Sequence, residues 1–135
     1  MIEGGGTSLD PMSDPVSPST GVGVLHLFCK PTPLFEPEAV VAAVKGAEAD
    51  GVQVVPVAIL GHKCDAAFMC VHADMRRLRA LQTALQHAGL DVVDSYVSIS
   101  EVSEYAKGMP EEMLRPRLYP TVPPTHLDYP MPAWC

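Results

Sequence analysis

The sequence predicts an α+β protein whose segments follow in the order strand, helix, strand, strand, helix, strand. Two observations support this prediction. Short apolar or alternating runs favour strands, and two longer stretches repeat apolar residues at helical spacing between them. This order is that of a ferredoxin-like domain, βαββαβ, with one sheet and both helices on the same face. The 135 residues are enough for a single domain with a core.

Composition divides the chain into three parts. Residues 1–20 are mostly Gly, Ser, Pro and Asp, have little to bury, and are predicted to be a disordered tail. Residues 21–105 hold every predicted strand and both predicted helices. Residues 106–135 are rich in proline, which favours an extended or polyproline backbone over a helix. We expect this last part to be a strap lying across another surface.

The first strand and the first helix have clear boundaries. Residues 21–29 alternate, but both faces of the alternation are largely apolar, which indicates that both sides of the sheet are covered. Pro37 suits the first turn of a helix, and Asp50 with Gly51 provides the turn that ends it. One domain cannot cover both sheet faces, so the first strand already indicates a partner.

The other strands are predicted at 52–60, 66–71 and 91–102. Pro56 cannot donate a hydrogen bond to a neighbouring strand, so the strand that contains it is expected at an edge or at a bulge. In the last strand, the alternation places Val97 on the opposite face from Tyr96.

The second helix is predicted to begin at the N-cap Asp74 and to end at Gly89. Its apolar stripe consists of Met75, Leu78, Leu81, Leu85 and Ala88. The same helix carries three arginines, Arg76, Arg77 and Arg79, which we expect to form a solvated face.

Charge and cysteine content exclude several classes. A net charge of −7 argues against a nucleic-acid binder, which needs a basic face. No apolar run is long enough for a membrane span, and no signal peptide is visible, so a cytoplasmic location is expected. The cysteines, at positions 29, 64, 70 and 135, lack the paired spacing of a zinc site. We therefore expect no metal site from them, and expect Cys29 and Cys70 to pack as small hydrophobes.

The face of the sheet opposite the helices is also predicted to be apolar. Two such faces are expected to meet as a dimeric α/β barrel, which makes the chain a homo-oligomer.

Several short blocks, in order along residues 21–131, carry a family resemblance. They are GVLHLF at 23–28, LGHKCD at 60–65, DSYVS at 94–98, EVSEY at 101–105, RLYP at 117–120, VPP at 122–124 and YPM at 129–131. Together they resemble the first half and the linking segment of chlorite dismutase family proteins, specifically the coproheme decarboxylase branch. The resemblance implies two such domains in tandem, of which this sequence holds the first. It thereby also implies a separate second-half subunit as a candidate partner.

The resemblance also implies a heme or coproheme site with a role in heme biosynthesis. Tyr129 matches the redox-active tyrosine of the YPM segment, and Arg117 and Met131 match residues that line the cofactor's propionates. A phenol can lose an electron and a proton together, and a guanidinium binds a carboxylate through two hydrogen bonds. The family's axial histidine belongs to the second domain, and no histidine of this chain matches it.

Two other functions remain open. The chain could be a non-catalytic dimeric remnant that binds a small apolar ligand or a second-half partner. Alternatively, it could be a cofactor-free enzyme of the wider dimeric α/β barrel superfamily, with His26 or Tyr96 as acid or base.

Overall fold

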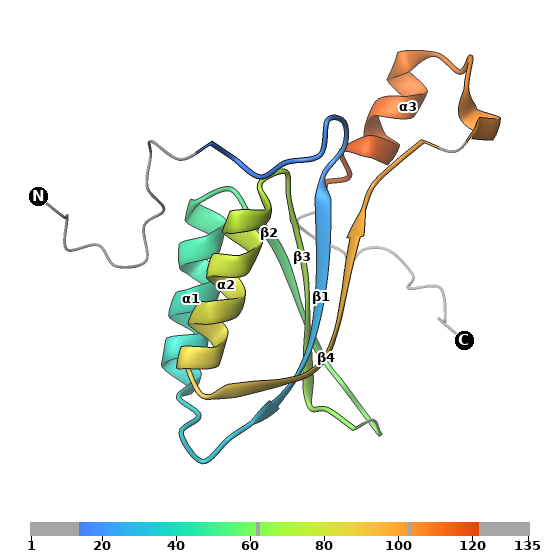
Figure 1. The fold of residues 1–135 in the computed structure, drawn as a ribbon. Helices are drawn as coiled ribbons and strands as arrows, with labels where there is room; N and C mark the ends of the chain where they lie inside the picture. Colours follow the sequence, from blue (N-terminus) through green and yellow to red (C-terminus); the bar gives the residue numbers. More distant parts are fainter. Residues whose placement is uncertain (1–13, 62, 103, 122–135) are drawn as a thin grey trace, which may run out of the picture.

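The computed structural model describes residues 14–61, 63–102 and 104–121. It contains one antiparallel sheet with the strand order β2-β3-β1-β4. The strands are β1 (Gly23–Pro31), β2 (Gln53–Ala58), β3 (Ala66–His72) and β4 (Leu90–Ile99), and the two helices between them are α1 (Pro37–Ala49) and α2 (Met75–His87). Both helices lie on the same face of the sheet (Figure 1). The predicted ferredoxin-like order is confirmed.

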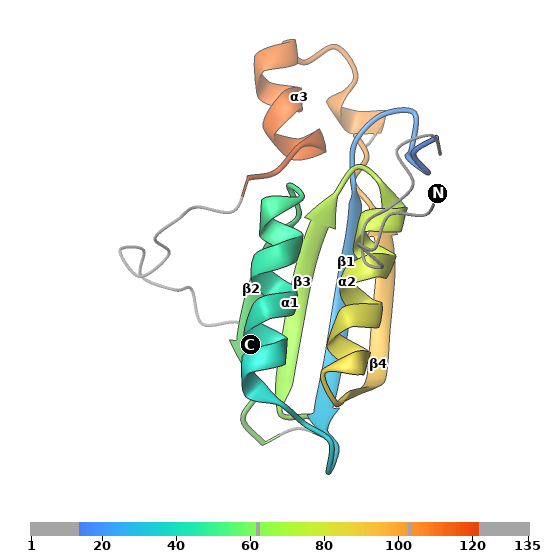
Figure 2. The same cartoon turned by 90° about the vertical axis from the view of Figure 1, so that its left-hand side faces the viewer.

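The helices divide that face between them. Seen from their side, α1 lies over β2 and α2 lies toward β1 and β4 (Figure 2). β2 is an edge strand, and Pro56 lies within it, as predicted. β1 is central, hydrogen-bonded to β3 on one side and to β4 on the other.

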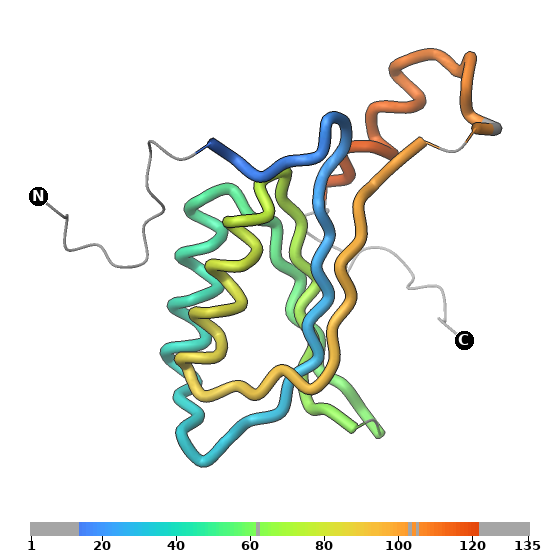
Figure 3. The backbone as a smooth tube through the Cα atoms, in the orientation of Figure 1, coloured from blue at the N-terminus to red at the C-terminus, as the bar shows by residue number. Residues whose placement is uncertain are grey.

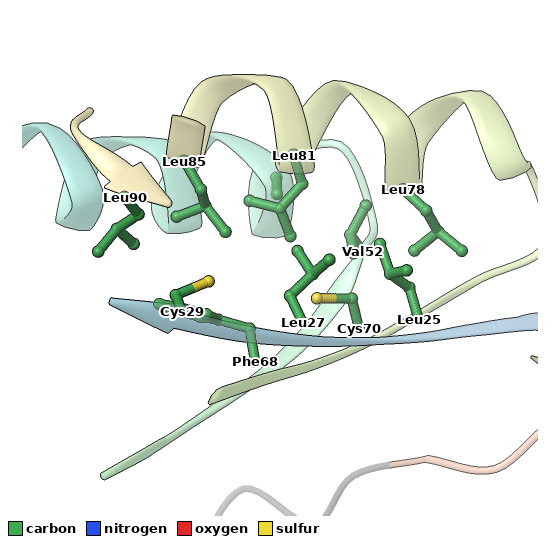
Figure 4. Close-up of a cluster of buried hydrophobic side chains, with 11 residues drawn as sticks. Leu25, Leu27, Cys29, Val52, Phe68, Cys70, Leu78, Leu81, Leu85 and Leu90 are labelled. Atoms are coloured by element: carbon green, nitrogen blue, oxygen red, sulfur yellow. The ribbon is translucent and has the colours of Figure 1, made fainter. Parts of the chain in front are cut away.

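The core lies between the sheet and the two helices (Figure 4). From the sheet it contains Leu25, Leu27, Cys29, Phe68 and Cys70, and from α2 it contains Leu78, Leu81 and Leu85. Leu27 and Leu85 are fully buried. The strand alternation and the helical stripe predicted from the sequence therefore meet in one core, where a fully buried leucine contributes about 1.5–3 kcal/mol.

The predicted helix ends are present. Pro37 begins α1 and Asp50 caps its C-terminus. Asp74 caps α2, its side chain accepting a hydrogen bond from the Arg76 backbone N–H at 3.0 Å. Gly89 follows α2 with φ of 92°, and a Cβ there would lie 2.4 Å from backbone atoms of Leu34. Only glycine suits that position.

Arg77 departs from the predicted solvated face. Its guanidinium lies 3.3 Å from the Asp50 carboxylate, so it joins α2 to the end of α1. Its side chain is 32% exposed, and the pair is a partly screened surface interaction.

β4 contains an irregularity that the pattern did not predict. The pairing with β1 shifts between Phe28 and Cys29, which leaves one extra residue on β4. Beyond this bulge, Val97 lies opposite Leu25, on the helix side of the sheet and away from Tyr96, as the alternation predicted. It is nevertheless 67% exposed, because the helices do not cover this end of the edge strand.

The prediction that residues 106–135 avoid helix is wrong for part of that segment. A short turn, η1 (Glu104–Ala106), leads to a helix, α3 (Glu111–Leu118), with Pro116 inside it. Proline costs this short helix one hydrogen bond. Acidic residues in the first turn and arginines in the last turn favour the helix through its dipole. The backbone then returns to the end of the sheet (Figure 3).

Within the described residues, no helix is both long and apolar enough to cross a lipid bilayer.

Candidate functional site

The sheet face opposite α1 and α2 is the candidate site, and we call it the open face. Directly paired residues of antiparallel strands share a face, so the register identifies its members. β1 contributes Val24, His26 and Phe28; β3 contributes Ala67, Met69 and Val71; β2 contributes Gln53, Val55 and Val57; β4 contributes Asp94, Tyr96 and Ser98. Most of these residues are apolar. In the described part of the chain, α1 and α2 both lie on the other side of the sheet (Figure 1).

His26 stands near the middle of the open face. It lies on the central strand, directly opposite Met69 on one side and Tyr96 on the other. Its side chain is half-buried. Phe28 packs edge to face against Tyr96 with ring centroids 5.9 Å apart. An imidazole beside a phenol, surrounded by apolar groups, can ligate a metal-bearing cofactor or exchange a proton.

A second group of contacts lies at the end of the sheet where β1 and β2 begin. Ser100 Oγ donates a hydrogen bond to the Leu118 carbonyl and accepts one from the Val22 N–H at 2.9 Å. Gln53 Nε2 donates to the Pro120 carbonyl at 2.9 Å. These bonds fasten the chain that follows α3 to this end of the sheet.

Tyr119 adds to the same attachment. Its hydroxyl accepts a hydrogen bond from the Gly21 N–H at 3.3 Å, and the Arg115 guanidinium lies 5.4 Å from the centre of its ring. Tyr119 belongs to the RLYP block seen in the sequence. Ser100 and Gln53 belong to none of the sequence blocks and could not be identified from the sequence, because their partners are far away in the chain.

The site residues predicted from the resemblance are not brought together within the described part of the chain. Arg117 is exposed in the last turn of α3, with Nη1 3.9 Å from the Met109 sulfur. Tyr129 and Met131 lie outside the described residues. The pair that the structure does bring together is His26 and Tyr96, the residues of the cofactor-free alternative.

The other described histidines are elsewhere. His72 accepts a hydrogen bond from the Asp74 N–H at 2.8 Å through Nδ1, beside the start of α2. His87 is exposed at the end of α2. Among the residues that the structure describes, no group of three or more His, Cys, Asp or Glu side chains is placed to hold a metal ion.

The cysteines in the core are not nucleophiles. Burial raises the pKa of the Cys29 thiol to about 11, with the nearby Cys64 and Asp91 adding to the shift. Burial likewise raises the pKa of Cys70 to about 12, with Cys29 contributing. Thiols that stay protonated at neutral pH are inert. The prediction that Cys29 and Cys70 pack as small hydrophobes is confirmed.

The fold recurs in solved structures. A heme-binding protein from Thermus thermophilus superposes with a TM-score of 0.58 at 25% identity, over 77% of this chain and 51% of that one. Two variants of the chlorite dismutase from Candidatus Nitrospira defluvii superpose with TM-scores of 0.50 and 0.51 at 16% identity, over 73% of this chain and 48% of theirs. At 16% identity the likeness shows the fold alone.

No family model and no curated protein matches the sequence. The chain spans about half the length of the solved structures it resembles. These structures share the fold that the resemblance implies, and they do not bear on the coproheme decarboxylase branch.

Proposed function

We propose that this chain is one half of a heme protein of the chlorite dismutase type, with its open face completed by another chain. The observation that carries the proposal is the open face itself: an apolar sheet surface with an imidazole near its middle. It occurs on a fold shared with about half of a heme-binding protein. A face of this kind on a single domain needs a cover.

The residues present fit a porphyrin in their chemistry. Val24, Val55 and Met69 offer an apolar surface for the ring, and Phe28 and Tyr96 offer aromatic edges. Arg117 is an exposed cation without a carboxylate partner in any described ion pair, so it can bind a propionate. When bound, the cofactor would supply peroxide-dependent oxidation chemistry.

We propose two alternative covers for the open face. The first is a second copy of this chain, which would pair sheet to sheet as a dimeric α/β barrel. The second is a separate second-half subunit, which would also bring the axial histidine that the family places in its second domain. We place the assembly in the cytoplasm, where buried unpaired cysteines such as Cys29 and Cys70 stay reduced.

In the finer proposal, the cofactor is coproheme and the chain takes part in its decarboxylation during heme biosynthesis. Arg117 and Met131 would contact the propionates, and Tyr129 would be the redox-active phenol. The RLYP, VPP and YPM blocks support these roles.

Titration with ferric heme and with ferric coproheme tests the proposal. We expect a shifted Soret band, and we expect Arg117→Ala to weaken binding by roughly 1–3 kcal/mol, the usual loss for a charge-assisted hydrogen bond. Arg79→Ala, an exposed arginine on α2, is the matched control and should leave binding unchanged. No spectral change with either porphyrin, alone or with a second-half partner, would remove the heme proposal.

The Tyr129→Phe variant separates binding from chemistry. It keeps the shape of the ring and removes the phenol, so it should bind coproheme as the parent chain does. With peroxide added, mass spectrometry of the porphyrin should find no decarboxylation by this variant. Decarboxylation at the parent rate would exclude Tyr129 from the role.

The pairing of His26 with Tyr96 favours a second candidate, a cofactor-free acid–base site on the same face. The two residues are directly paired across β1 and β4 on a largely apolar surface, so an imidazole and a phenol are both available there to exchange a proton with a substrate. A protein that forms dimers without binding a porphyrin would favour this function or a non-catalytic remnant. Loss of turnover in His26→Ala would then favour the acid–base site over the non-catalytic remnant.

A further inference from the structure

His26 interrupts the apolar middle of the open face. The two central strands of the sheet are β3 and β1, and their other open-face residues are Val24, Phe28, Ala67, Met69 and Val71. All of these are apolar. The remaining polar residues of the face lie on the outer strands β2 and β4, and they are Gln53, Asp94, Tyr96 and Ser98. A polar side chain in the middle of an apolar surface calls for an explanation.

The His26 imidazole has no partner among the residues that the structure describes. No hydrogen bond, ion pair or ring contact joins it to any of them. The side chain is half-buried, and a chain or ligand that covers the open face would bury it further. Burying an imidazole without a partner is costly, so whatever covers this face has to offer His26 a bond. A porphyrin iron does so, because the metal accepts the lone pair of a ring nitrogen.

A row of side chains crosses the sheet at His26. Met69 lies directly opposite it on one side and Tyr96 on the other. Val55 lies opposite Met69 and extends the row to β2. Directly paired residues have Cβ atoms about 4.5–5.5 Å apart, so a flat ring bound above His26 would lie over its neighbours in this row. The row therefore offers three groups that can bind iron: a thioether, an imidazole and a phenol.

The imidazole is the best suited of the three to hold ferric iron. It binds as a neutral ring, and histidine is a common axial ligand in heme proteins. A phenol binds as its anion, which is costly on an apolar face, and Tyr96 lies on the outer strand, 60% exposed and packed against Phe28. The thioether of Met69 is a soft ligand that prefers reduced metals.

We infer that His26 is an axial ligand for the iron of a porphyrin seated on the open face. This chain then supplies its own ligand and does not depend on one from a second-half subunit. The inference rests on the proposed heme function, and it departs from the resemblance, which places the axial histidine in the second domain. If a second copy covers the face, symmetry brings a second His26 to the same site, and the iron can bind both imidazoles.

Pulsed electron paramagnetic resonance of the isolated chain with ferric heme tests the ligand. With nitrogen-15 introduced only at histidine, the iron should couple to a labelled nucleus, because the porphyrin's own nitrogens are unlabelled. His26→Ala should lose this coupling and weaken binding by roughly tenfold or more. Added imidazole should then restore the parent absorption spectrum. His87→Ala is the matched control, exposed at the end of α2, and should keep both the coupling and the affinity.

Further variants separate His26 from its neighbours. Met69→Leu and Tyr96→Phe nearly keep the size of the side chains and should retain the nitrogen-15 coupling. Far-ultraviolet circular dichroism checks the fold of each variant. If His26→Ala does not fold, His26→Gln keeps a polar side chain at this position and should lose the coupling in the same way.

The outcomes distinguish the ligand from the heme function. Heme binding without nitrogen-15 coupling, or with unchanged coupling in a folded His26 variant, would overturn the inference and leave the heme proposal standing. Heme binding that appears only when a second-half partner is added would also overturn the inference alone. Absence of heme binding in both arrangements would remove the inference together with the proposed function.

Discussion

Phe28 and Tyr96 meet edge to face on the side of the sheet that no helix covers, with ring planes at 89°. Phe28 belongs to the central strand and Tyr96 to the edge strand β4. Such a pair stabilises by about 0.5–1.5 kcal/mol beyond the area it buries. Tyr96 still remains 60% exposed. The contact therefore orders the open face without covering it.

Tyr96→Arg should abolish self-association and porphyrin binding while the domain stays folded. A charge on the open face would be desolvated by any sheet or cofactor packed there. Light scattering and the Soret titration measure the two effects. Val97→Arg is the matched control, because Val97 is adjacent, 67% exposed and on the opposite face.

If both variants prevent association, the interface is the edge of β4 and not the open face. A parent chain that scatters as a 14.5 kDa monomer at micromolar concentration would contradict the homo-oligomer prediction itself.

Replacing two glycines by alanine should change stability in opposite directions. Gly89→Ala places a Cβ at positive φ and 2.4 Å from the Leu34 backbone, so it should destabilise by more than about 1 kcal/mol. Gly46→Ala lies within α1 with no atom within 4 Å of the new Cβ, so it should stabilise by roughly 0.5–1 kcal/mol. Urea unfolding monitored by circular dichroism gives both values. A loss of stability in both variants would contradict the open space that the structure gives to a Cβ at position 46.

Asp74→Ala should destabilise the protein by about 1 kcal/mol, because its carboxylate caps α2. The same oxygen accepts a hydrogen bond from the Val16 N–H at 3.1 Å, so hydrogen exchange at Val16 should accelerate too. Asp74→Asn keeps the accepting oxygen and should retain most of the stability. An equal loss in both variants would assign the effect to charge and not to the cap.

Stability should fall as the pH rises from 9 toward 11, because of the core thiols. In the unfolded chain they ionise near pH 9, whereas burial raises the folded pKa of Cys29 to about 11 and that of Cys70 to about 12. In this window the folded state holds protons that the unfolded state has lost, so rising pH favours unfolding. Below pH 9 the two thiols are protonated in both states, so their contribution to the stability of the folded state is fully present there. Cys70→Ala should flatten the pH dependence of the urea midpoint, and an unchanged slope would contradict the assignment.

Local patterns in the sequence were enough to predict the four strands, the helices α1 and α2, and the order in which they follow. Pro56 marked an edge strand, Asp74 and Gly89 marked the ends of α2, and the leucine stripe of α2 marked its buried face. Each of these features depends on one residue or on a few neighbours, since backbone preference, capping and periodicity act locally. The apolar character of both faces of β1 was also visible in the alternation. For the candidate site, the sequence indicated which kinds of residue are present, but not which of them lie close together.

Which residues meet was settled by the packing of the folded chain. The bulge in β4 sets the side on which Val97 lies, and the limited coverage by the helices leaves it exposed. The helix α3 contains Pro116, which costs it one hydrogen bond, and charged residues at both ends stabilise it through its dipole. The proline content of the sequence did not predict the outcome of this balance. Gln53 and Pro120 are 67 residues apart in the chain. Such a contact follows from strand register and from the path of the chain after α3, which no local pattern encodes.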